Sequence, residues 1–254
     1  MRIFFHHICG KMTDMSLIYA NAYAEVEESE EDYALKNGWA VDEWTKKTPR
    51  LWFQARQTRV KVSDFKYNKK VNKILRRGSS VSHKIKPLKD ANIDELQDVY
   101  DRYMKYKGFT DDLGALSLKD EIDKDKKIVF QFYDEGVLRG FTLSRIYGGS
   151  NSITGLQFCW DYHKPSIALG KYSTIKEIEY AKENGMDYVY MMSGYEEACI
   201  YKGSFAGFEF WDGEKWSNDK KLYEDMCQKD SEIKTFEDMN KLMWGYEKDY
   251  FKIC

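Results

Sequence analysis

The order of predicted elements between residues 127 and 192 restricts the possible folds of this chain more than any other feature. Three strand-like runs follow one another, separated by short turns that are rich in Gly, Asp and Asn. A helix with Gly185 as its stop and a further strand come next. The strands are predicted over residues 127–133, 137–147, 152–162 and 187–192, and the helix over residues 169–184. A meander that continues into a helix and another strand predicts an α+β fold.

The segments before this core indicate a second, smaller unit. Residues 15–37 predict a helix, and one or two strands are expected within residues 52–62. Residues 78–87 begin with Gly and Ser and are typical of a linker. We therefore expect a smaller α+β domain followed by a larger one, which begins with a helix and ends with a helical tail. The expected domains are residues 1–85 and 86–254, with the first helix of the larger one over residues 92–107.

A basic segment between Lys46 and Lys86 contrasts with the rest of the chain. It contains 14 Lys and Arg residues and one acidic residue, Asp64, so its charge is +13, whereas the whole chain has a net charge of −2. Such a block costs self-repulsion unless a polyanion offsets it. Because aromatic residues lie within the segment, we predict nucleic-acid binding, with a merely solvated face as the alternative. The candidate phosphate-binding residues are Arg56, Arg59, Lys69, Lys70, Lys73, Arg76 and Arg77.

The sequence shows neither a membrane segment nor a cysteine framework. No apolar run approaches the roughly 18 residues that a membrane span needs, and the start of the chain lacks the core of a signal peptide. We therefore expect a cytoplasmic protein without a membrane partner. The five cysteines lie far apart and form no C-x-x-C pair, so we expect isolated thiols and no metal site.

Residues 156–205 contain several short motifs in a characteristic order. A Trp-Asp-Tyr turn leads to Leu-Gly-x-Tyr at the start of a helix, and a Tyr-x-Tyr strand and a Tyr-Lys pair follow. The matching positions are Trp160-Asp161-Tyr162, Leu169-Gly170-Lys171-Tyr172, Glu177 to Ala181, Gly185, Tyr188-Val189-Tyr190, Gly194-Tyr195, and Tyr201-Lys202-Gly203 with Phe205. This set resembles the C-terminal domain of arginyl-tRNA–protein transferases and of their bacterial leucyl-tRNA–protein transferase relatives. Weaker matches extend the resemblance upstream, into residues 37–39, 59–65 and 73–77.

The resemblance implies an acetyltransferase-like (GNAT-like) C-terminal domain, in which a meander, a helix and a strand follow one another. It implies an enzyme that moves an amino acid from aminoacyl-tRNA to an amine acceptor, above all the N-terminus of a protein or peptide. The implied partners are therefore tRNA and a protein or peptide. Because aminoacyl-tRNA is already an activated ester, it serves as co-substrate and we expect no cofactor.

Two departures from the family pattern limit what the resemblance implies. Where the family carries a cysteine pair before an Arg-x-x-Val strand, this chain has Trp52 and Ala55, so no metal or cluster is expected there. The loop over residues 196–200 is shorter than in the family. The identities of the donor amino acid and of the acceptor therefore stay open.

Candidate site residues follow from the same resemblance. A backbone N–H near residues 158–160 is expected to face the ester carbonyl, and the helix start at residues 169–171 is expected to hold phosphate. Tyr172 stands where coenzyme A users have a small residue, which favours tRNA as the donor. The substrate-binding candidates are Trp160, Leu169, Gly170, Lys171, Tyr172, Tyr201 and Lys202. The catalytic candidates are Glu196, Asp161 and Tyr195.

Alternatives exist for these residues and for the function. Lys202 is otherwise a solvated lysine after a strand, Glu196 a member of a solvated acidic loop, and Asp161 the cap of a turn. Two other functions stay open, an acetyl-CoA-dependent N-acetyltransferase of the GNAT fold and a nucleic-acid-binding module without catalysis.

Overall fold

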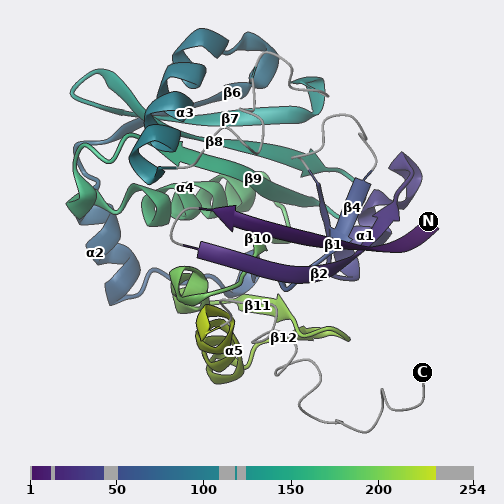
Figure 1. Ribbon diagram of the computed structural model, residues 1–254. Coiled ribbons are helices and arrows are strands. Elements are labelled where there is room, and N and C mark those ends of the chain that lie inside the picture. Colours follow the sequence, from purple (N-terminus) through teal and green to yellow (C-terminus); the bar gives the residue numbers. More distant parts are fainter. Residues whose placement is uncertain (1, 13–14, 43–50, 109–117, 119–123, 233–254) are drawn as a thin grey trace, which may run out of the picture.

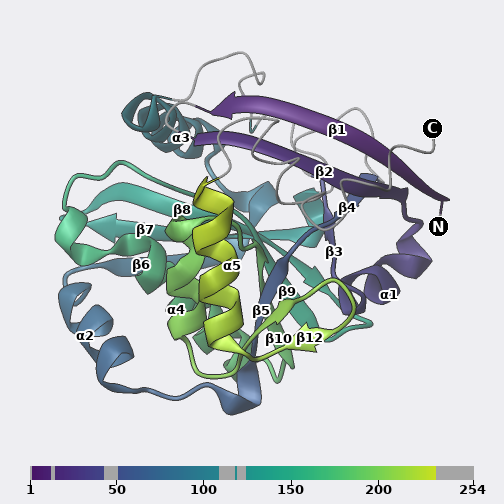
Figure 2. The same cartoon turned by 60° about the horizontal axis from the view of Figure 1, so that its bottom comes forward.

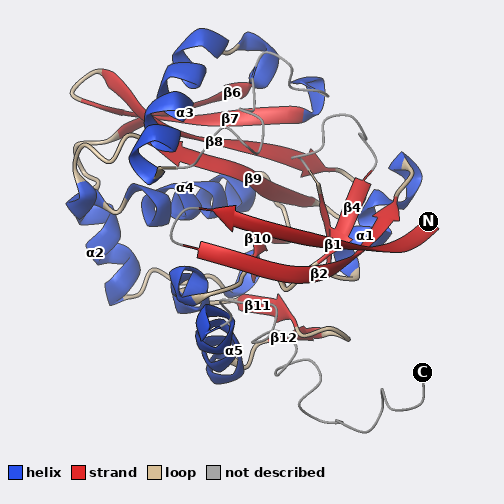
Figure 3. Cartoon of the chain, viewed as in Figure 1, coloured by secondary structure: helices blue, strands red, loops and turns tan. Residues whose placement is uncertain are grey.

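The strands in the described part of the chain form two sheets (Figures 1 and 3). The computed structural model describes residues 2–12, 15–42, 51–108, 118 and 124–232. From edge to edge, the larger sheet consists of β12 (Trp216–Ser217), β11 (Phe208–Trp211), β5 (Gln57–Lys61), β10 (Tyr188–Ser193), β9 (Ser152–Trp160), β8 (Val137–Tyr147), β7 (Lys127–Asp134) and β6 (Ser82–Pro87). The smaller sheet consists of β1 (Arg2–Met12), β2 (Met15–Glu25), β4 (Leu51–Gln54) and β3 (Trp39–Val41).

The predicted meander and the helix and strand that follow it are confirmed. Strands β7, β8 and β9 pair antiparallel in sequence order. The turn between β7 and β8 has Glu135 and Gly136 at φ of 55° and 77°, a left-handed pair that suits a two-residue hairpin. Helix α4 (Leu169–Glu183) then returns the chain so that β10 pairs parallel to β9. The sheet is therefore mixed, and the predicted α+β fold class is confirmed.

The two long helices cover opposite faces of the larger sheet. Successive side chains of a strand point to opposite faces, and the neighbours Val129 and Phe130 of β7 belong to different cores. Phe130 packs with α4, and Val129 packs with α3 (Ile93–Lys107). Figure 2 shows α3 and α4 on either side of β7 and β8.

Two shorter helices flank α4 and the end of the sheet. Helix α2 (Lys69–Arg77) lies next to α4 (Figure 1). The two are so close that an added Cβ at Gly78, directly after α2, would lie 2.4 Å from the Tyr172 ring of α4. Helix α5 (Lys220–Glu232) covers β11, with Tyr223 packed between Phe208 and Phe210. Among the described residues no helix is both long and apolar enough to cross a membrane.

The predicted helix over residues 15–37 is wrong in its first half. Met15–Glu25 is strand β2, which pairs with β1 along its whole length, and helix begins only later, as the 3₁₀ turn Glu28–Glu30 followed by α1 (Glu31–Lys36). The alanines of this segment favour a helix locally, but pairing with β1 and β4 decides the outcome. The helical tail is described as far as Glu232 in α5, and residues 233–254 lie outside the described part.

The division of the chain at residue 85 stays a prediction. The sheets change membership earlier, because β4 belongs to the smaller sheet and β5 to the larger one. The two sheets also share a core, in which Trp52 of β4 packs edge-on against Tyr147 of β8 at 6.1 Å between ring centroids.

Candidate functional site

Strands β9 and β10 separate after a short parallel pairing. Their ladder runs from Tyr188 and Ser152 to Tyr190 and Thr154, after which β9 continues with β8 and β10 continues with β5. The register of β9 against β8 shifts next to Gly155, and that of β10 against β5 shifts between Tyr190 and Ser193. Bulges in both strands increase twist and bend them apart at this point.

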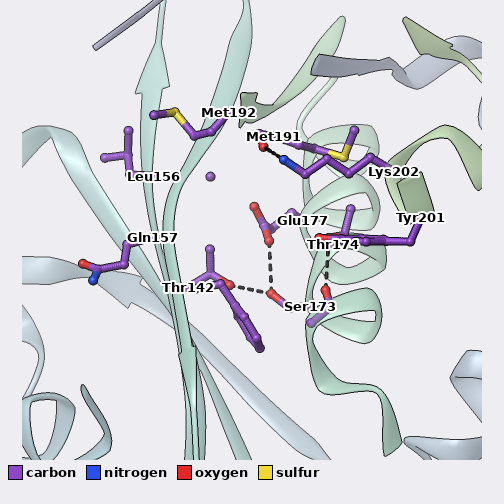
Figure 4. A pocket seen from close by; sticks show the side chains of 13 residues that line it. Thr142, Leu156, Gln157, Ser173, Thr174, Glu177, Met191, Met192, Tyr201 and Lys202 are labelled. Carbon is purple, nitrogen blue, oxygen red and sulfur yellow. Dashed lines mark hydrogen bonds between the residues drawn. The ribbon is translucent and has the colours of Figure 1, made fainter. Parts of the chain in front are cut away.

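A pocket of about 180 Å³ occupies the space between the separated strands and α4 (Figure 4). Strands β8, β9 and β10 form one wall, α4 forms another, and the 3₁₀ helix Glu197–Ser204 closes the pocket. The lining residues are Thr142, Gly155, Leu156, Gln157, Phe158, Gly170, Ser173, Thr174, Glu177, Met191, Met192, Tyr201 and Lys202. Since Gly170 lies in the first turn of α4 and Glu177 two turns later, the pocket follows about 10 Å of the helix.

The carboxylate of Glu177 points from α4 into this pocket (Figure 4). Its residue is 6% exposed, and Ser173 Oγ donates to Glu177 Oε1 at 3.1 Å. Because the one hydroxyl proton of Ser173 takes part in this bond, Ser173 Oγ is the acceptor in its contact with Thr142, whose hydroxyl donates at 2.5 Å. Burial raises the pKa of Glu177 to about 7, although the hydrogen bonds with Ser173 and Thr142 act against this rise.

Lys202 is the other charged group of the pocket lining. It is 8% exposed, and its Nζ donates to the carbonyl oxygens of Met191 and Ser193 at 2.6 and 2.8 Å. These bonds tie the end of β10 to the segment that closes the pocket. Burial lowers the pKa of Lys202, so the pocket moves the pKa of both its acid and its base toward neutrality.

Two glycines make room for these side chains. A Cβ at Gly155 would lie 2.5 Å from Glu177 Oε2, so the carboxylate occupies the space that a side chain of β9 would fill. A Cβ at Gly170 would lie 3.2 Å from the Phe158 ring, which allows α4 to start close to β9. Small residues at both positions therefore set the width of the pocket.

The structure brings some of the predicted substrate-binding residues to this pocket. Gly170, Tyr201 and Lys202 line it, and Lys171 Nζ lies 5.4 Å from the centroid of the Tyr201 ring. The remaining candidates, Trp160, Leu169 and Tyr172, are buried in the core that packs α4 on the sheet. Of the segment expected to face the ester carbonyl, residues 158–160, Phe158 lines the pocket, together with the three residues before it.

The three predicted catalytic residues lie elsewhere, and none is among the residues that line this pocket. Asp161 Oδ2 accepts from Arg102 and Arg139 at 2.6 and 3.1 Å, so its carboxylate is part of an ion-pair network. The hydroxyl of Tyr195 accepts from the backbone N–H of Arg56 at 2.9 Å. The backbone N–H of Glu196 donates to Asp230 of α5 at 3.1 Å.

Glu177 begins a segment that matches the family motif, but the sequence interpretation gave it no role in the site. It lies four residues after Ser173 and four before Ala181, both buried, so it is on the inward face of α4. A carboxylate at such a position is rarely buried without a role.

The predicted phosphate-binding residues fall into two groups. Arg56 is ion-paired with Asp230 of α5 at 2.5 Å. Arg59 is buried, pairs with Glu209 at 2.7 Å, and has its guanidinium 4.0 and 3.8 Å from the ring centroids of Tyr188 and Trp216. The other group is exposed on α2 and consists of Lys69, Lys70, Lys73, Arg76 and Arg77.

Comparison with protein families identifies the chain from its sequence. The model of the family described as arginine-tRNA-protein transferase, C terminus, matches residues 83–212, which is just over half of the chain. The chain belongs to this family. The match contains the whole pocket lining. A search of curated proteins finds no match.

A comparison with solved structures finds similar chains at low sequence identity. The C-terminal domain of a putative lysylphosphatidylglycerol synthetase from Agrobacterium fabrum has a TM-score of 0.46 and 11% identity, with 65% of this chain and 51% of that chain covered. L-PGS from Bacillus licheniformis has a TM-score of 0.45 and 14% identity, with coverages of 70% and 57%. A GCN5-related N-acetyltransferase from Kribbella flavida has a TM-score of 0.37 and 12% identity, with coverages of 64% and 55%. This chain therefore spans little more than half the length of these structures.

Proposed function

We propose that this chain is an aminoacyltransferase that moves an amino acid from aminoacyl-tRNA to an amine acceptor, the N-terminus of a protein or peptide. The observation that carries the proposal is the pocket between the separated strands β9 and β10, which contains Glu177 and Lys202 and lies inside the segment that the family model matches. Its volume of about 180 Å³ suits an aminoacyl group rather than a larger ligand.

The exposed basic face of α2 is the proposed surface for the tRNA donor. Helix α2 lies beside the start of α4, where Gly78 packs on Tyr172. The pocket lining begins at Gly170, in the first turn of α4. Phosphates held at α2 would therefore place the 3′ end of a tRNA near the pocket. The proposed contacts are Lys69, Lys70, Lys73, Arg76 and Arg77.

The proposed reaction needs positioning more than it needs new reactive groups. The acceptor amine attacks the carbonyl carbon of the ester, the bond to the ribose oxygen breaks, and that oxygen leaves as an alcohol. An ammonium has three N–H donors, and Lys202 gives two of them to Met191 and Ser193. In the proposal its third donor approaches the carbonyl oxygen of the ester, where negative charge develops.

A transfer assay tests this function directly. The protein is incubated with a pool of radiolabelled aminoacyl-tRNAs and with peptides of varied N-terminal residue, and label in the peptide is measured. We expect peptide labelling that depends on a free N-terminus. No labelling from any charged tRNA, together with acetylation of an amine by acetyl-CoA, would instead support an N-acetyltransferase.

The proposed tRNA surface is tested separately by binding. Lys73→Glu on α2 should weaken tRNA binding and reduce the slope of log K against log salt by about 1, because one phosphate contact is lost. Lys221→Glu is the matched control, since Lys221 is an exposed lysine on α5. Equal weakening by both variants would show that only net charge matters, and would remove α2 from the proposal.

A further inference from the structure

The pocket contains one carboxylate, and its surroundings hold it in a defined place. Glu177 Oε1 accepts from Ser173, and Glu177 Oε2 lies over Gly155 at the wall of the cavity. The strand residues around it are neutral, namely Thr142, Gly155, Leu156, Gln157, Phe158, Met191 and Met192. The titratable groups that face it are Tyr201 and Lys202, both from the segment Glu197–Ser204.

An amine acceptor poses a protonation problem that this carboxylate can solve. The α-amino group of a peptide has a pKa of about 7.7–8.0, so most of it is an ammonium ion at neutral pH and cannot attack an ester. A positioned group inside the pocket that accepts this proton leaves the amine free to attack. Glu177 is the acceptor of suitable chemistry among the residues that line the pocket.

We propose that Glu177 is the catalytic residue that removes the proton from the attacking amine, an inference that rests on the proposed transferase function. The Glu177 carboxylate takes one proton from the ammonium, and the free amine attacks the carbonyl carbon. The C–N bond forms as the bond to the ribose oxygen breaks. The nitrogen then gives up its second proton, which passes to the ribose oxygen, and Glu177 returns its own proton to solvent after release.

The environment of Glu177 matches its pKa to this task. A carboxylate with a pKa near 4.3 would take a proton from an α-amino group with an equilibrium more than about 1000-fold unfavourable. Burial raises the pKa of Glu177 to about 7, so the same transfer is only about tenfold unfavourable. The Thr142–Ser173 chain of hydroxyls stabilises the ionised carboxylate and keeps the pKa from rising further.

Two substitutions on the same helix test the role. Glu177→Gln removes the proton acceptor, and Glu179→Gln is the matched control, because Glu179 lies outside the pocket and pairs with Lys176. In single-turnover transfer with the full chain, we expect Glu177→Gln to slow transfer to an ordinary peptide by about 100-fold or more. Glu179→Gln should transfer like the wild type. The wild-type rate should rise with pH through an apparent pKa near 7, whereas the slower rate of Glu177→Gln should rise only as the free amine forms, through about 7.7–8.0.

An acceptor that needs no deprotonation separates catalysis from structure. A peptide whose N-terminal amine is replaced by an aminooxy group presents an unprotonated nitrogen at neutral pH. Glu177→Gln should therefore label the aminooxy peptide nearly as fast as the wild type does. Gly155→Ala displaces the carboxylate without removing it, so it should slow transfer to the ordinary peptide much more than to the aminooxy peptide.

The outcomes distinguish this inference from the proposed function. If the wild type transfers no amino acid to either peptide, the proposed function fails and this inference fails with it. If the wild type transfers and Glu177→Gln matches it on the ordinary peptide, the inference alone is refuted. Equal loss on both peptides would likewise refute proton removal and assign Glu177 to binding of the donor.

Discussion

The buried Glu177 carboxylate should make the free energy of unfolding depend on pH in a way that a single substitution removes. In the unfolded chain this carboxyl has the ordinary pKa of 4.5, and in the folded chain burial raises it to about 7. Between these two values the folded state binds more protons than the unfolded state. Stability therefore falls as the pH rises from about 4.5 to about 7, and the contribution is lost above that window.

The size of this effect follows from the two pKa values. At about 1.4 kcal/mol for each pH unit, the whole window corresponds to about 3 kcal/mol. Between pH 5 and pH 8 the difference is about 2.5 kcal/mol. Glutamine resembles the protonated carboxyl, so the stability of Glu177→Gln should not fall over this pH range as that of the wild type does. The stability difference between Glu177→Gln and the wild type should therefore shift in favour of Glu177→Gln by about 2.5 kcal/mol between pH 5 and pH 8.

Urea unfolding of both proteins at pH 5 and pH 8 measures this quantity. Comparing the two proteins at the two pH values cancels the contributions of other titrating groups to the pH dependence of stability. One such group is Asp134, whose pKa is lowered by its hydrogen bonds with His163, Lys164 and Ser80. A difference between Glu177→Gln and the wild type that is the same at both pH values would refute the reasoning.

Two further predictions concern the frame around the site. Gly38→Ala should destabilise the fold by about 3 kcal/mol, because Gly38 has φ of 78° and an added Cβ would lie 2.3 Å from the Trp211 ring. The control Gly185→Ala should cost only about 1 kcal/mol, because Gly185 has a similar φ of 67° but open space around it. Equal losses of stability in urea unfolding would contradict the role of the clash. Asp161→Asn should lower the free energy of unfolding by about 2 kcal/mol in the same assay, because the partly exposed guanidinium groups of Arg102 and Arg139 lose their shared carboxylate. A loss of transfer activity without a loss of stability would instead support the catalytic role predicted from the sequence.

The sequence predicts local elements well and distant pairings poorly. The meander and α4 are predicted because alternation, turn residues and a helical stripe are all local properties. Met15–Glu25 is predicted wrongly because its strand state depends on β1, which precedes it in the chain, and on β4, which follows much later. Separation of β9 from β10 depends on two bulges, for which no local pattern is visible.

The candidate site shows the same limit. Lys202 and Tyr201 are predicted from their motif, and both line the pocket. Glu196 and Tyr195 follow the same strand end in sequence, but the chain turns there toward Arg56 and Asp230. Glu177 could have been found from helical spacing alone, as a carboxylate on the buried face of an otherwise correctly predicted helix.

The basic segment contributes to the site from the inside as well as from the surface. Its strand β5 lies between β10 and β11, and Thr58 Oγ1 donates to the carbonyl oxygen of Met192 at 2.7 Å. Met192 has φ of 59° and lines the pocket, so β5 holds the bulge that opens it.

The place of β5 leads to a prediction that tests the division of the chain at residue 85. A fragment of residues 86–254 lacks β5, so it would leave edges of β10 and β11 unpaired and would uncover the core surface that Val60 and Thr58 bury. This fragment should therefore show no cooperative urea transition and no transfer, although it contains every residue that lines the pocket. Adding the fragment of residues 1–85 in trans should restore both, since it supplies the missing central strand. A cooperative, active fragment of residues 86–254 would show instead that the larger domain folds by itself, and that β5 only covers a pocket which the rest of the sheet already forms.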